Sequence, residues 1–378
     1  MGVRRRTTDD GRRAANKTRL IRLPLVARRP SPSSCSSLVT RHSSLHFSLA
    51  PFAFFLFTSQ QSVLDPAGPQ AARLSGLWWA FFYVLATVYV VVMVVLVAGV
   101  VRSRRRRAAT EGVFLRREAG RERRIGRVVT GAVALTVLTL FALLTASFLT
   151  GRRVYSLSDP DPLEVRVIGR QWWWEVRYDG ERPSEIVATA NEIHVPVGRL
   201  VRFHLESRDV IHSFWVPNLH GKKDLVPNNP AETYLRADRP GEYWGQCAEF
   251  CGLQHAHMRL LVVAEPPEQF EAWLAAQKKP APPPSTESQS RGQQIFLSGT
   301  CVMCHTVAGT PARGTVGPNL THVASNKTIA AGSLANTREN LARWVTDSQS
   351  VKPGTRMPPH TLAPEDLEAV LDYLESLK

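Results

Sequence analysis

Two long uncharged stretches in the first half of the chain limit the folds that it can adopt. Residues 77–101 form 25 consecutive residues without a charge, and residues 128–150 form 23 more. Each stretch is long enough to cross a hydrocarbon core of about 30 Å as a helix that rises about 1.5 Å per residue. Arginines close both stretches. We therefore expect a transmembrane hairpin within residues 62–152, with buried helices of a soluble protein as the alternative.

The positive charge of the chain lies outside its globular-looking segments. The formal net charge is +15, of which residues 1–50 contribute +9 and the segment 102–127, between the two uncharged stretches, contributes +8. A nucleic-acid-binding protein would instead place this charge on one face of a folded domain. We therefore expect no nucleic-acid partner. The arginine-rich segment is expected in the cytoplasm, with both ends of the hairpin on the outer side of the membrane.

Residues 1–61 have the composition of a leader. An arginine- and serine-rich stretch is followed by an apolar run at residues 47–57, which has the length of a signal-peptide core and is too short to span a membrane. The basic stretch is long for a signal peptide, so a start codon placed too early is an alternative. Cys35 lies in this segment, and we assign no role to it.

Short alternating segments predict a β-sandwich over residues 153–278. Apolar and polar residues alternate around Val165, Ile193 and Phe203, and turn sequences such as Asp-Gly at residues 179–180 separate these segments. About 100 residues of short strands with regular turns are typical of a small sandwich.

A proline-rich linker, residues 279–289, leads to a mostly helical module, residues 290–378. The module contains CxxCH, the attachment sequence of c-type haem, as Cys301, Cys304 and His305. Two thiols at this spacing add to the vinyl groups of the haem, and the adjacent histidine becomes an axial ligand of the iron. A thioredoxin-like pair would need a βαβ context, and a zinc knuckle would need a second pair of ligands. We therefore predict covalently bound haem c.

A second cluster of sulfur and imidazole groups lies in the segment GQCAEFCGLQHAHM. Cys247 and Cys251 are four residues apart, so both thiolates can face one metal, and His255 and Met258 follow them. His212, about 35 residues earlier, can supply a further imidazole. Soft sulfur ligands with imidazole at the end of a β-sandwich suit copper. A disulfide between the cysteines and a structural zinc site stay open as alternatives.

These motifs resemble a known family. Residues 163–277 resemble the CuA domain of cytochrome c oxidase subunit 2 through Gly169 with the run QWWWE, through DVIHSFWVP and GKKD, and through GQCAEFCGLQHAHM. The two uncharged stretches match the two spans of that subunit. With its C-terminal module, the chain from residue 62 onward resembles the fused, caa3-type form. The fold class that this implies is a two-helix transmembrane hairpin, a cupredoxin-like sandwich and an all-α class I cytochrome c domain.

The resemblance implies a binuclear CuA centre. In the family pattern, Cys247 and Cys251 bridge two copper ions, His212 and His255 each bind one of them, and Met258 is a weak axial ligand. Four other histidines match no ligand position and are expected to be structural or exposed: His194, His204, His220 and His257.

Two further residues receive a role from the resemblance. The carbonyl of Glu249 matches the second weak axial ligand of copper, and its side chain matches a group that reaches a magnesium ion at the interface with subunit 1. Trp172 matches the tryptophan through which electrons enter the copper centre. The alternative for residues 172–174 is a place in the core of the sandwich, where alternation would bury Trp173 or its neighbours.

The C-terminal module resembles a class I cytochrome c over residues 290–378. Gly292 and Phe296 match positions on the first helix that contact the last helix, where Tyr373 matches. Met357 matches the distal ligand of the iron.

Three other side chains in the module could also bind the iron, namely Met303, His322 and His360. Met303 lies inside the attachment sequence on the proximal side, and His322 follows the loop 317–320, which the family packs at the haem edge. Two prolines follow Met357, and proline holds the residue before it in an extended conformation. The pattern therefore favours Met357.

The function implied is that of the subunit through which electrons enter a haem–copper terminal oxidase. Electrons would pass from a donor, cytochrome c or a bc1-type complex, to haem c, to CuA and to subunit 1, where dioxygen is reduced to water. Subunit 3 is a further expected partner. The expected location is a bacterial inner membrane, with the sandwich and the haem module on the periplasmic side. The alternative is a membrane-anchored copper-delivery protein with a haem c module.

Three features depart from the family pattern. Pro-Asn at residues 227–228 stands where Pro-Gly is usual, and Ala231 replaces a common asparagine. Asparagine tolerates a positive φ better than most residues, so we expect the turn to persist. Thr58 and Ser59 stand where related fused subunits often carry a lipidated cysteine, so we expect no lipid anchor.

Overall fold

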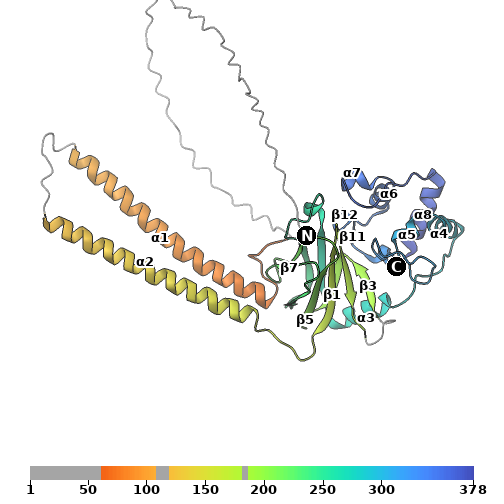
Figure 1. The fold of residues 1–378 in the computed structure, drawn as a ribbon, viewed down its shortest axis with the longest axis horizontal. Helices are drawn as coiled ribbons and strands as arrows, with labels where there is room; N and C mark the ends of the chain where they lie inside the picture. Colours follow the sequence, from red (N-terminus) through yellow and green to blue (C-terminus); the bar gives the residue numbers. More distant parts are fainter. Residues whose placement is uncertain (1–60, 108–118, 181–185) are drawn as a thin grey trace, which may run out of the picture. The chain divides into compact units, whose positions relative to one another are not determined.

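The computed structural model describes residues 61–107, 119–180 and 186–378. The leader-like segment up to residue 60 and the middle of the arginine-rich segment lie outside the described residues. The described part contains a pair of long helices, a β-sandwich and a C-terminal helical module (Figure 1). The expected fold class is therefore confirmed.

The two uncharged stretches form helices α1 (Pro69–Arg107) and α2 (Ala119–Val154). Both helices are long and apolar enough to cross a membrane, and their apolar windows are not buried by any other described part of the chain. Exposed apolar side chains of this kind, such as Val95 at 66% and Phe141 at 69%, are those that lipid can cover. The alternative of buried helices in a soluble protein therefore does not hold.

Three hydroxyl groups of α2 bond within their own helix. Thr136, Thr139 and Thr145 each donate to the carbonyl four residues earlier, over 2.8–2.9 Å. These hydroxyls are satisfied without a neighbouring helix, although they still leave a small-residue surface on which another helix can pack.

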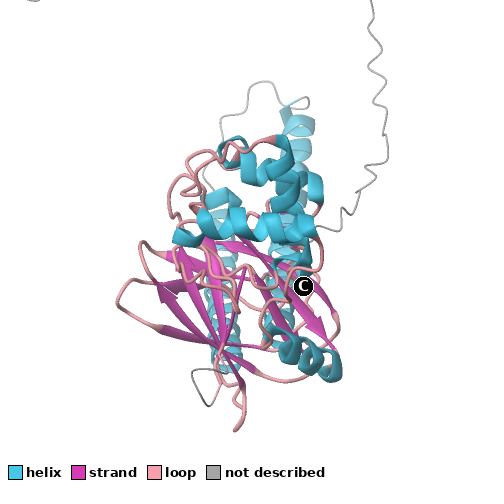
Figure 2. Cartoon of the chain, turned by 90° about the vertical axis from the view of Figure 1, so that its right-hand side faces the viewer, coloured by secondary structure: helices cyan, strands magenta, loops and turns pink. Residues whose placement is uncertain are grey.

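Ten strands form the sandwich, which Figure 2 shows in magenta. The sheet orders are β3-β2-β1-β5-β8 and β4-β10-β9-β6-β7. The β1–β5 and β4–β10 pairs are parallel, and the other pairs are antiparallel. The strands are β1 (Leu163–Arg170), β2 (Trp173–Tyr178), β3 (Val187–Ala190), β4 (Glu192–Pro196), β5 (Val201–Ser207), β6 (His212–Trp215), β7 (Lys223–Leu225), β8 (Ala231–Leu235), β9 (Gly241–Cys247) and β10 (Arg259–Glu265).

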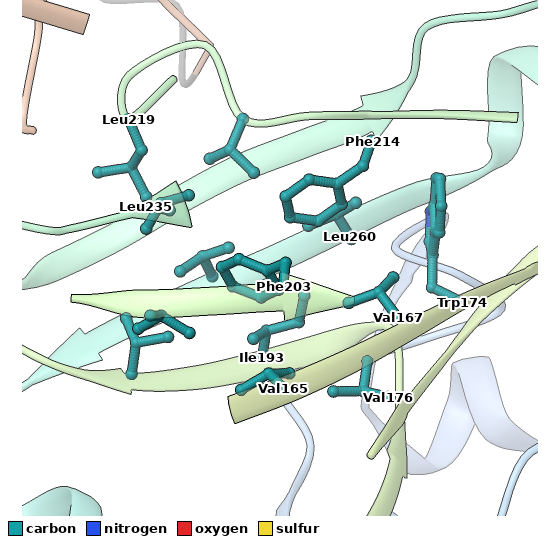
Figure 3. Packing of buried hydrophobic residues seen from close by; sticks show 14 of the residues in the cluster. Val165, Val167, Trp174, Val176, Ile193, Phe203, Phe214, Leu219, Leu235 and Leu260 are labelled. Carbon is teal, nitrogen blue, oxygen red and sulfur yellow. The ribbon is translucent and has the colours of Figure 1, made fainter. Parts of the chain in front are cut away.

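The expected alternation places every second side chain between the two sheets. Val165 and Val167 of β1 are fully buried, as are Phe203 of β5 and Ile193 of β4 (Figure 3). Since successive side chains of a strand point to opposite faces, the residues between them lie on the outer faces. The core therefore forms from the residues that the alternation marked.

Helix α3 (Pro267–Gln277) follows the last strand and was not expected from the sequence. Its only fully buried residue is Phe270, which joins the core of the sandwich, and Trp273 packs edge-on against Tyr178 with ring centroids 5.2 Å apart. The helix has only 11 residues, so its periodic pattern is short and easily overlooked.

The C-terminal module has its own core, between its first and last helices. A Cβ at Gly292 would lie 1.9 Å from the carbonyl oxygen of Ala369, so only glycine permits this close approach. Phe296 meets Tyr373 nearby, with ring centroids 5.7 Å apart, as expected. The elements are α4 (Glu287–Ser298), α5 (Cys301–Cys304), η3 (Val323–Ser325), β11 (Thr328–Ile329), β12 (Leu334–Ala335), α6 (Arg338–Thr346), α7 (Ser348–Val351) and α8 (Pro364–Ser376).

The first helix of the module begins inside the segment expected to be linker. Thr286 caps α4 by accepting a hydrogen bond from the amide of Gln289 at 3.1 Å, and the helix starts at Glu287. Threonine at this position satisfies an amide that the first turn leaves unpaired. We therefore define the C-terminal module as residues 287–378.

Asn228, which stands where the family usually has glycine, has a positive φ. Asn228 has φ +60°, in the left-handed region that glycine would occupy most easily. The turn is therefore kept, as expected from the tolerance of asparagine for this conformation.

Candidate copper and haem sites

The sulfur and imidazole cluster forms where two neighbouring strands meet a loop. Cys247 is the last residue of β9, and Cys251 and His255 follow on the loop that leads to β10. His212 is the first residue of β6, which pairs with β9 so that Phe214 lies opposite Cys247. The pairing of these strands therefore brings two distant parts of the sequence to one point.

The spacing of the sulfur atoms distinguishes among the alternatives. Cys247 Sγ and Cys251 Sγ lie 3.7 Å apart, and both thiols are free. A disulfide requires about 2.05 Å, so the disulfide alternative does not fit. Metal–sulfur bonds of about 2.3 Å allow two sulfurs at this separation to share a metal ion.

Each sulfur atom has its own imidazole. His212 Nδ1 lies 3.8 Å from the sulfur of Cys247, and His255 Nδ1 lies 3.6 Å from that of Cys251. The donor atoms of His212 and the two cysteines all lie within 4.8 Å of one another. The four groups therefore fit a soft metal such as copper.

Weak donors complete the cluster. The thiol of Cys247 donates to the carbonyl oxygen of Glu249 at 3.2 Å, and Met258 Sδ lies 3.9 Å from the sulfur of Cys251. Met258 is fully buried. The side chain of Glu249 is 43% exposed, and its carboxylate lies 3.6 Å from Lys222 Nζ. The carbonyl and the side chain of Glu249 are thus available for different partners.

Asp209 orients the imidazole of His212. Its carboxylate lies 2.8 Å from His212 Nε2 and accepts the backbone amide of Gln171 at 2.7 Å. Burial lowers the pKa of His212, but the bonds to Asp209 and Cys247 outweigh this, so that the pKa is raised. With Nε2 engaged, Nδ1 faces the sulfurs, as in metal sites where a carboxylate holds the histidine ligand.

The two thiols titrate as a pair. The hydrogen bond with Cys251, followed by that with His212, lowers the pKa of Cys247 against the effect of burial. The Cys247 sulfur and burial raise the pKa of Cys251. A metal ion that binds both sulfurs as thiolates therefore competes with protons for the pair.

Gly169 makes room for His212. A Cβ at this position would lie 2.7 Å from His212 Cδ2 and 2.9 Å from Cγ, closer than real Cβ contacts. The residue lies on β1, so the sheet opposite His212 approaches the imidazole directly. The glycine in the sequence motif thus has a steric reason.

Trp172 and Gln171 both contact the backbone of the cluster. The indole Nε1 of Trp172 and the side-chain amide of Gln171 each donate to the carbonyl of Cys251 at 2.9 Å. Trp174 is fully buried in the core and Trp173 is only partly buried, beneath the guanidinium of Arg170. Alternation therefore buries the neighbours of Trp173, and Trp172 lies next to the cluster.

The four remaining histidines lie away from these ligand groups. His194 stacks on Trp273 and lies 2.9 Å from Glu265, and His204 lies 2.7 Å from Glu164. The ring nitrogen Nδ1 of His220 is buried without a hydrogen-bond partner among the described residues, and His257 is exposed. Their expected structural or exposed character agrees with these positions.

A cavity of about 620 Å³ lies beside the CxxCH sequence. Its walls include Cys301, Cys304, His305 and Met357, together with Trp172 of the sandwich. Pockets of roughly 300–1,000 Å³ are typical of cofactor sites. The residues that would attach and ligate a haem therefore surround one space of suitable size.

His305 is held in the orientation that an iron ligand needs. Its Nδ1 lies 2.7 Å from the carbonyl oxygen of Pro318, so Nδ1–H donates there and Nε2 is left as the free acceptor. A Cβ at Gly317 would lie 2.7 Å from His305 Cε1, so glycine lets this loop close on the ring. Burial lowers the pKa of His305 and favours the neutral, ligating form.

Met357 lines the cavity on a braced segment. Its carbonyl accepts from the hydroxyl of Ser348 at 2.7 Å and from the side-chain amide of Gln349 at 3.1 Å. His360 also lines the cavity, with Nδ1 3.5 Å from the hydroxyl of Thr300. His322 does not line it and lies 3.0 Å from the carbonyl of Lys279 instead.

Comparison with known proteins identifies a family for each of the two domains. Residues 179–265 match the family model of cytochrome c oxidase subunit II, periplasmic domain, and residues 289–378 match that of cytochrome c. Cytochrome c oxidase subunit 2 of Alkalihalophilus pseudofirmus (strain ATCC BAA-2126 / JCM 17055 / OF4) is 36% identical over 276 residues, which cover 70% of this chain and 78% of the relative. The chain belongs to the cytochrome c oxidase subunit 2 family. The subunit 2 of Bacillus sp. (strain PS3) is 32% identical over 288 residues, covering 70% of this chain and 80% of the relative.

Among solved structures, the periplasmic domain of subunit II of cytochrome oxidase (CoxB) of Bradyrhizobium japonicum aligns with a TM-score of 0.30 and 27% identity. It covers 32% of this chain and 97% of that chain.

Membership of the subunit 2 family defines the role of the chain. It is the subunit through which electrons enter a haem–copper oxidase, it works with other subunits of that oxidase, and its sandwich and C-terminal module are copper and haem c domains. The two long helices anchor it in a membrane. A copper-delivery protein is therefore not supported.

Sequence reasoning missed two residues of these sites. Asp209 stands three residues before His212, inside a motif that was recognised, so the spacing of a carboxylate to a ligand histidine could have identified it. Lys352, which also lines the haem cavity, shows no such pattern in the sequence.

Proposed function

We propose that the copper site of this subunit is a binuclear CuA centre. The observation that carries the proposal is the paired arrangement, in which sulfurs 3.7 Å apart each lie beside a separate imidazole. Cys247 and Cys251 would bridge two copper ions, and His212 and His255 would bind one each. A single structural zinc would use the same four groups but would give no reason for Met258 and the Glu249 carbonyl beside them.

The exposed carboxylate of Glu249 is proposed as a magnesium ligand. It lies on the surface of the copper loop, where a second subunit could supply further oxygen ligands, as magnesium prefers. Lys222, 3.6 Å away, would then have to move aside or bind the same partner.

In the C-terminal module, we propose that Cys301 and Cys304 attach the haem and that His305 and Met357 bind its iron. His305 offers Nε2 from a ring fixed by Pro318, and Met357 faces the same cavity. A Met/His pair raises the haem potential relative to two histidines, which favours uptake of electrons from the donor.

When bound, the haem and the copper carry single electrons, and the residues of this chain fix their positions and exclude water. We propose that Trp172 is the point where electrons enter the copper site. It lines the haem cavity and donates to the carbonyl of Cys251, so it touches both sites.

We further propose subunits 1 and 3 of the oxidase as the membrane partners and cytochrome c or a bc1-type complex as the donor. The location would be the bacterial inner membrane, with residues after 151 on the periplasmic side because eleven arginines lie in the segment 102–127. Protease added to spheroplasts should cleave after residue 151 and spare that segment. Cleavage in the segment from outside would mean that the orientation is reversed.

The copper proposal is tested on the full chain in detergent. Copper loading should give two copper ions per chain and a spectrum with the unpaired electron shared between them. Cys251→Ser should abolish that shared-spin signal, because a hydroxyl does not bridge as a soft thiolate does. One bound zinc ion and no colour after copper loading would contradict the proposal.

A further inference from the structure

The C-terminal module contacts the sandwich through two of its loops. In the turn between β11 and β12, the carbonyl of Ala331 accepts the backbone amide of Arg259 at 3.1 Å. In the loop after α7, the carbonyl of Pro353 accepts the side-chain amide of Gln254 at 2.5 Å. Both bonds join residues of different domains, and the amide of Arg259 can exchange only if the contact opens.

Glycines let these loops approach closely. Gly332 has φ +72°, and a Cβ there would lie 2.9 Å from Arg259 Cβ and 3.0 Å from the ring of Trp244. Gly354 has φ +83°, and a Cβ there would lie 2.8 Å from Leu253 Cδ1. Glycine at these two positions therefore lets the loops of the module lie directly against the sandwich.

A lysine of the module is buried in this contact. Lys352 is 2% exposed, and its ammonium group donates to the carbonyl of Trp172 at 3.0 Å and to that of Ala330 at 3.4 Å. Among the described residues, no carboxylate forms an ion pair with it. Burial lowers its pKa to about 7. A buried amine is costly, so its retention needs a reason beyond the stability of the module.

A glutamate of the sandwich is buried in the same contact. Glu192 is 2% exposed and accepts the backbone amide of Thr328 at 2.8 Å and its hydroxyl at 3.3 Å. Burial raises the pKa of Glu192. Each domain thus buries one ionisable group that makes at least one hydrogen bond to the other domain.

We propose that Lys352 and Glu192 are positioning residues that hold the C-terminal module on the sandwich with the haem cavity facing Trp172. The inference rests on the proposed function in taking this cavity as the haem site. Lys352 fixes the main chain of Trp172 itself, while Glu192 fixes the module at Thr328 of β11. The module is therefore docked and does not swing freely on its linker.

A further bond places the haem ligand segment next to the copper loop. The guanidinium of Arg356, the neighbour of Met357, donates to Gln171 Oε1 at 2.6 Å, and the side-chain NH2 of Gln171 donates to the carbonyl of Cys251. The docked arrangement therefore brings the segment of the distal ligand within two hydrogen bonds of a copper ligand.

The test uses hydrogen exchange of the full chain, loaded with copper and haem in detergent. The amides of Arg259 and Thr328 donate across the contact and report its opening. Lys352→Met should speed their exchange at least roughly tenfold, because a hydrogen bond to a charged group is lost. The amide of Leu341, bonded within the module to Thr337, should keep its exchange rate.

Lys327→Met is the matched control. Lys327 lies in the same contact and pairs with Glu242, but both side chains are 48% exposed, so little change is expected. Glu192→Ala, on the other domain, is the second variant and should release the amide of Thr328 in the same way. Unchanged or slower exchange in both variants would overturn the proposal, even if one of them folds poorly.

Electron transfer from haem to copper is the second measurement. Lys352→Met should slow it while the copper spectrum and the haem absorption stay as in the unaltered chain. Faster exchange with unchanged electron transfer would overturn the positioning role. If the unaltered chain passes no electrons to copper but Lys352→Met still speeds exchange, the proposed function fails and the docking remains.

Discussion

The indole of Trp172 donates a hydrogen bond to the backbone carbonyl of Cys251 over 2.9 Å. The same tryptophan lines the haem cavity, and its own carbonyl is held by Lys352. One residue therefore contacts the copper loop through its ring and the C-terminal module through its main chain.

The role of Trp172 can be separated from that of a core residue. Trp172→Phe should keep the copper content but slow the arrival of electrons at copper, because the bond to Cys251 is lost. Flash-induced electron transfer measures this directly. Trp174→Ala is the contrast, since it empties a fully buried site and should cost about 3–5 kcal/mol of stability. Loss of copper in Trp172→Phe would instead indicate a structural role.

Gly169→Ala should disturb the copper site without unfolding the sandwich. The new methyl group would meet the imidazole of His212 at 2.7 Å, and overpacking of this kind costs about 1–3 kcal/mol. We expect lower copper retention during dialysis against a chelator. Gly221→Ala is the control, because its Cβ would find only an ordinary contact of 3.7 Å with Leu74. Equal copper retention in both variants would contradict the prediction.

Met357→Ala should change the haem while leaving it attached. The variant should lose the weak far-red band of a sulfur–iron bond, and its potential should fall. Absorption spectra and a redox titration are the measurements. His360→Ala should keep the band, because His360 lines the cavity beside the hydroxyl of Thr300. If only His360→Ala removes the band, Met357 is not the ligand.

The burial of Glu192 predicts a pH dependence of stability. Because burial raises the pKa of Glu192, the folded chain keeps its proton above the ordinary value of 4.5, where the unfolded chain has lost it. The free energy of unfolding should therefore fall as the pH rises from 4.5 through the raised pKa. Glu192→Gln should remove this part of the pH-dependent decrease in the free energy of unfolding. Denaturant unfolding between pH 4 and pH 8 measures it.

The control for this pH effect is Glu242→Gln, since Glu242 is 48% exposed and pairs with Lys327 at the surface. Its pH profile should follow that of the unaltered chain. If the free energy of unfolding changes with pH by the same slope in Glu192→Gln and in the unaltered chain, Glu192 has an ordinary pKa in the folded state.

Local patterns were sufficient to predict most elements of the fold. The uncharged stretches became α1 and α2 because length and the absence of charge act within a single helix. The alternation around Phe203 became a buried strand face, because successive side chains of a single strand point to opposite faces. The CxxCH sequence places its two thiols and His305 together through one helical turn.

The sequence by itself determined most of the groups that can bind copper and haem, because Cys247–Met258 and Cys301–His305 are short segments with a fixed spacing. Only the tertiary structure decided how these segments meet. The pairing of β6 with β9 brings His212 to Cys247, and the folded loop orients it through Asp209. Likewise, the burial of Lys352 against Trp172 depends on two segments 180 residues apart in the chain, and no local periodicity records such a contact.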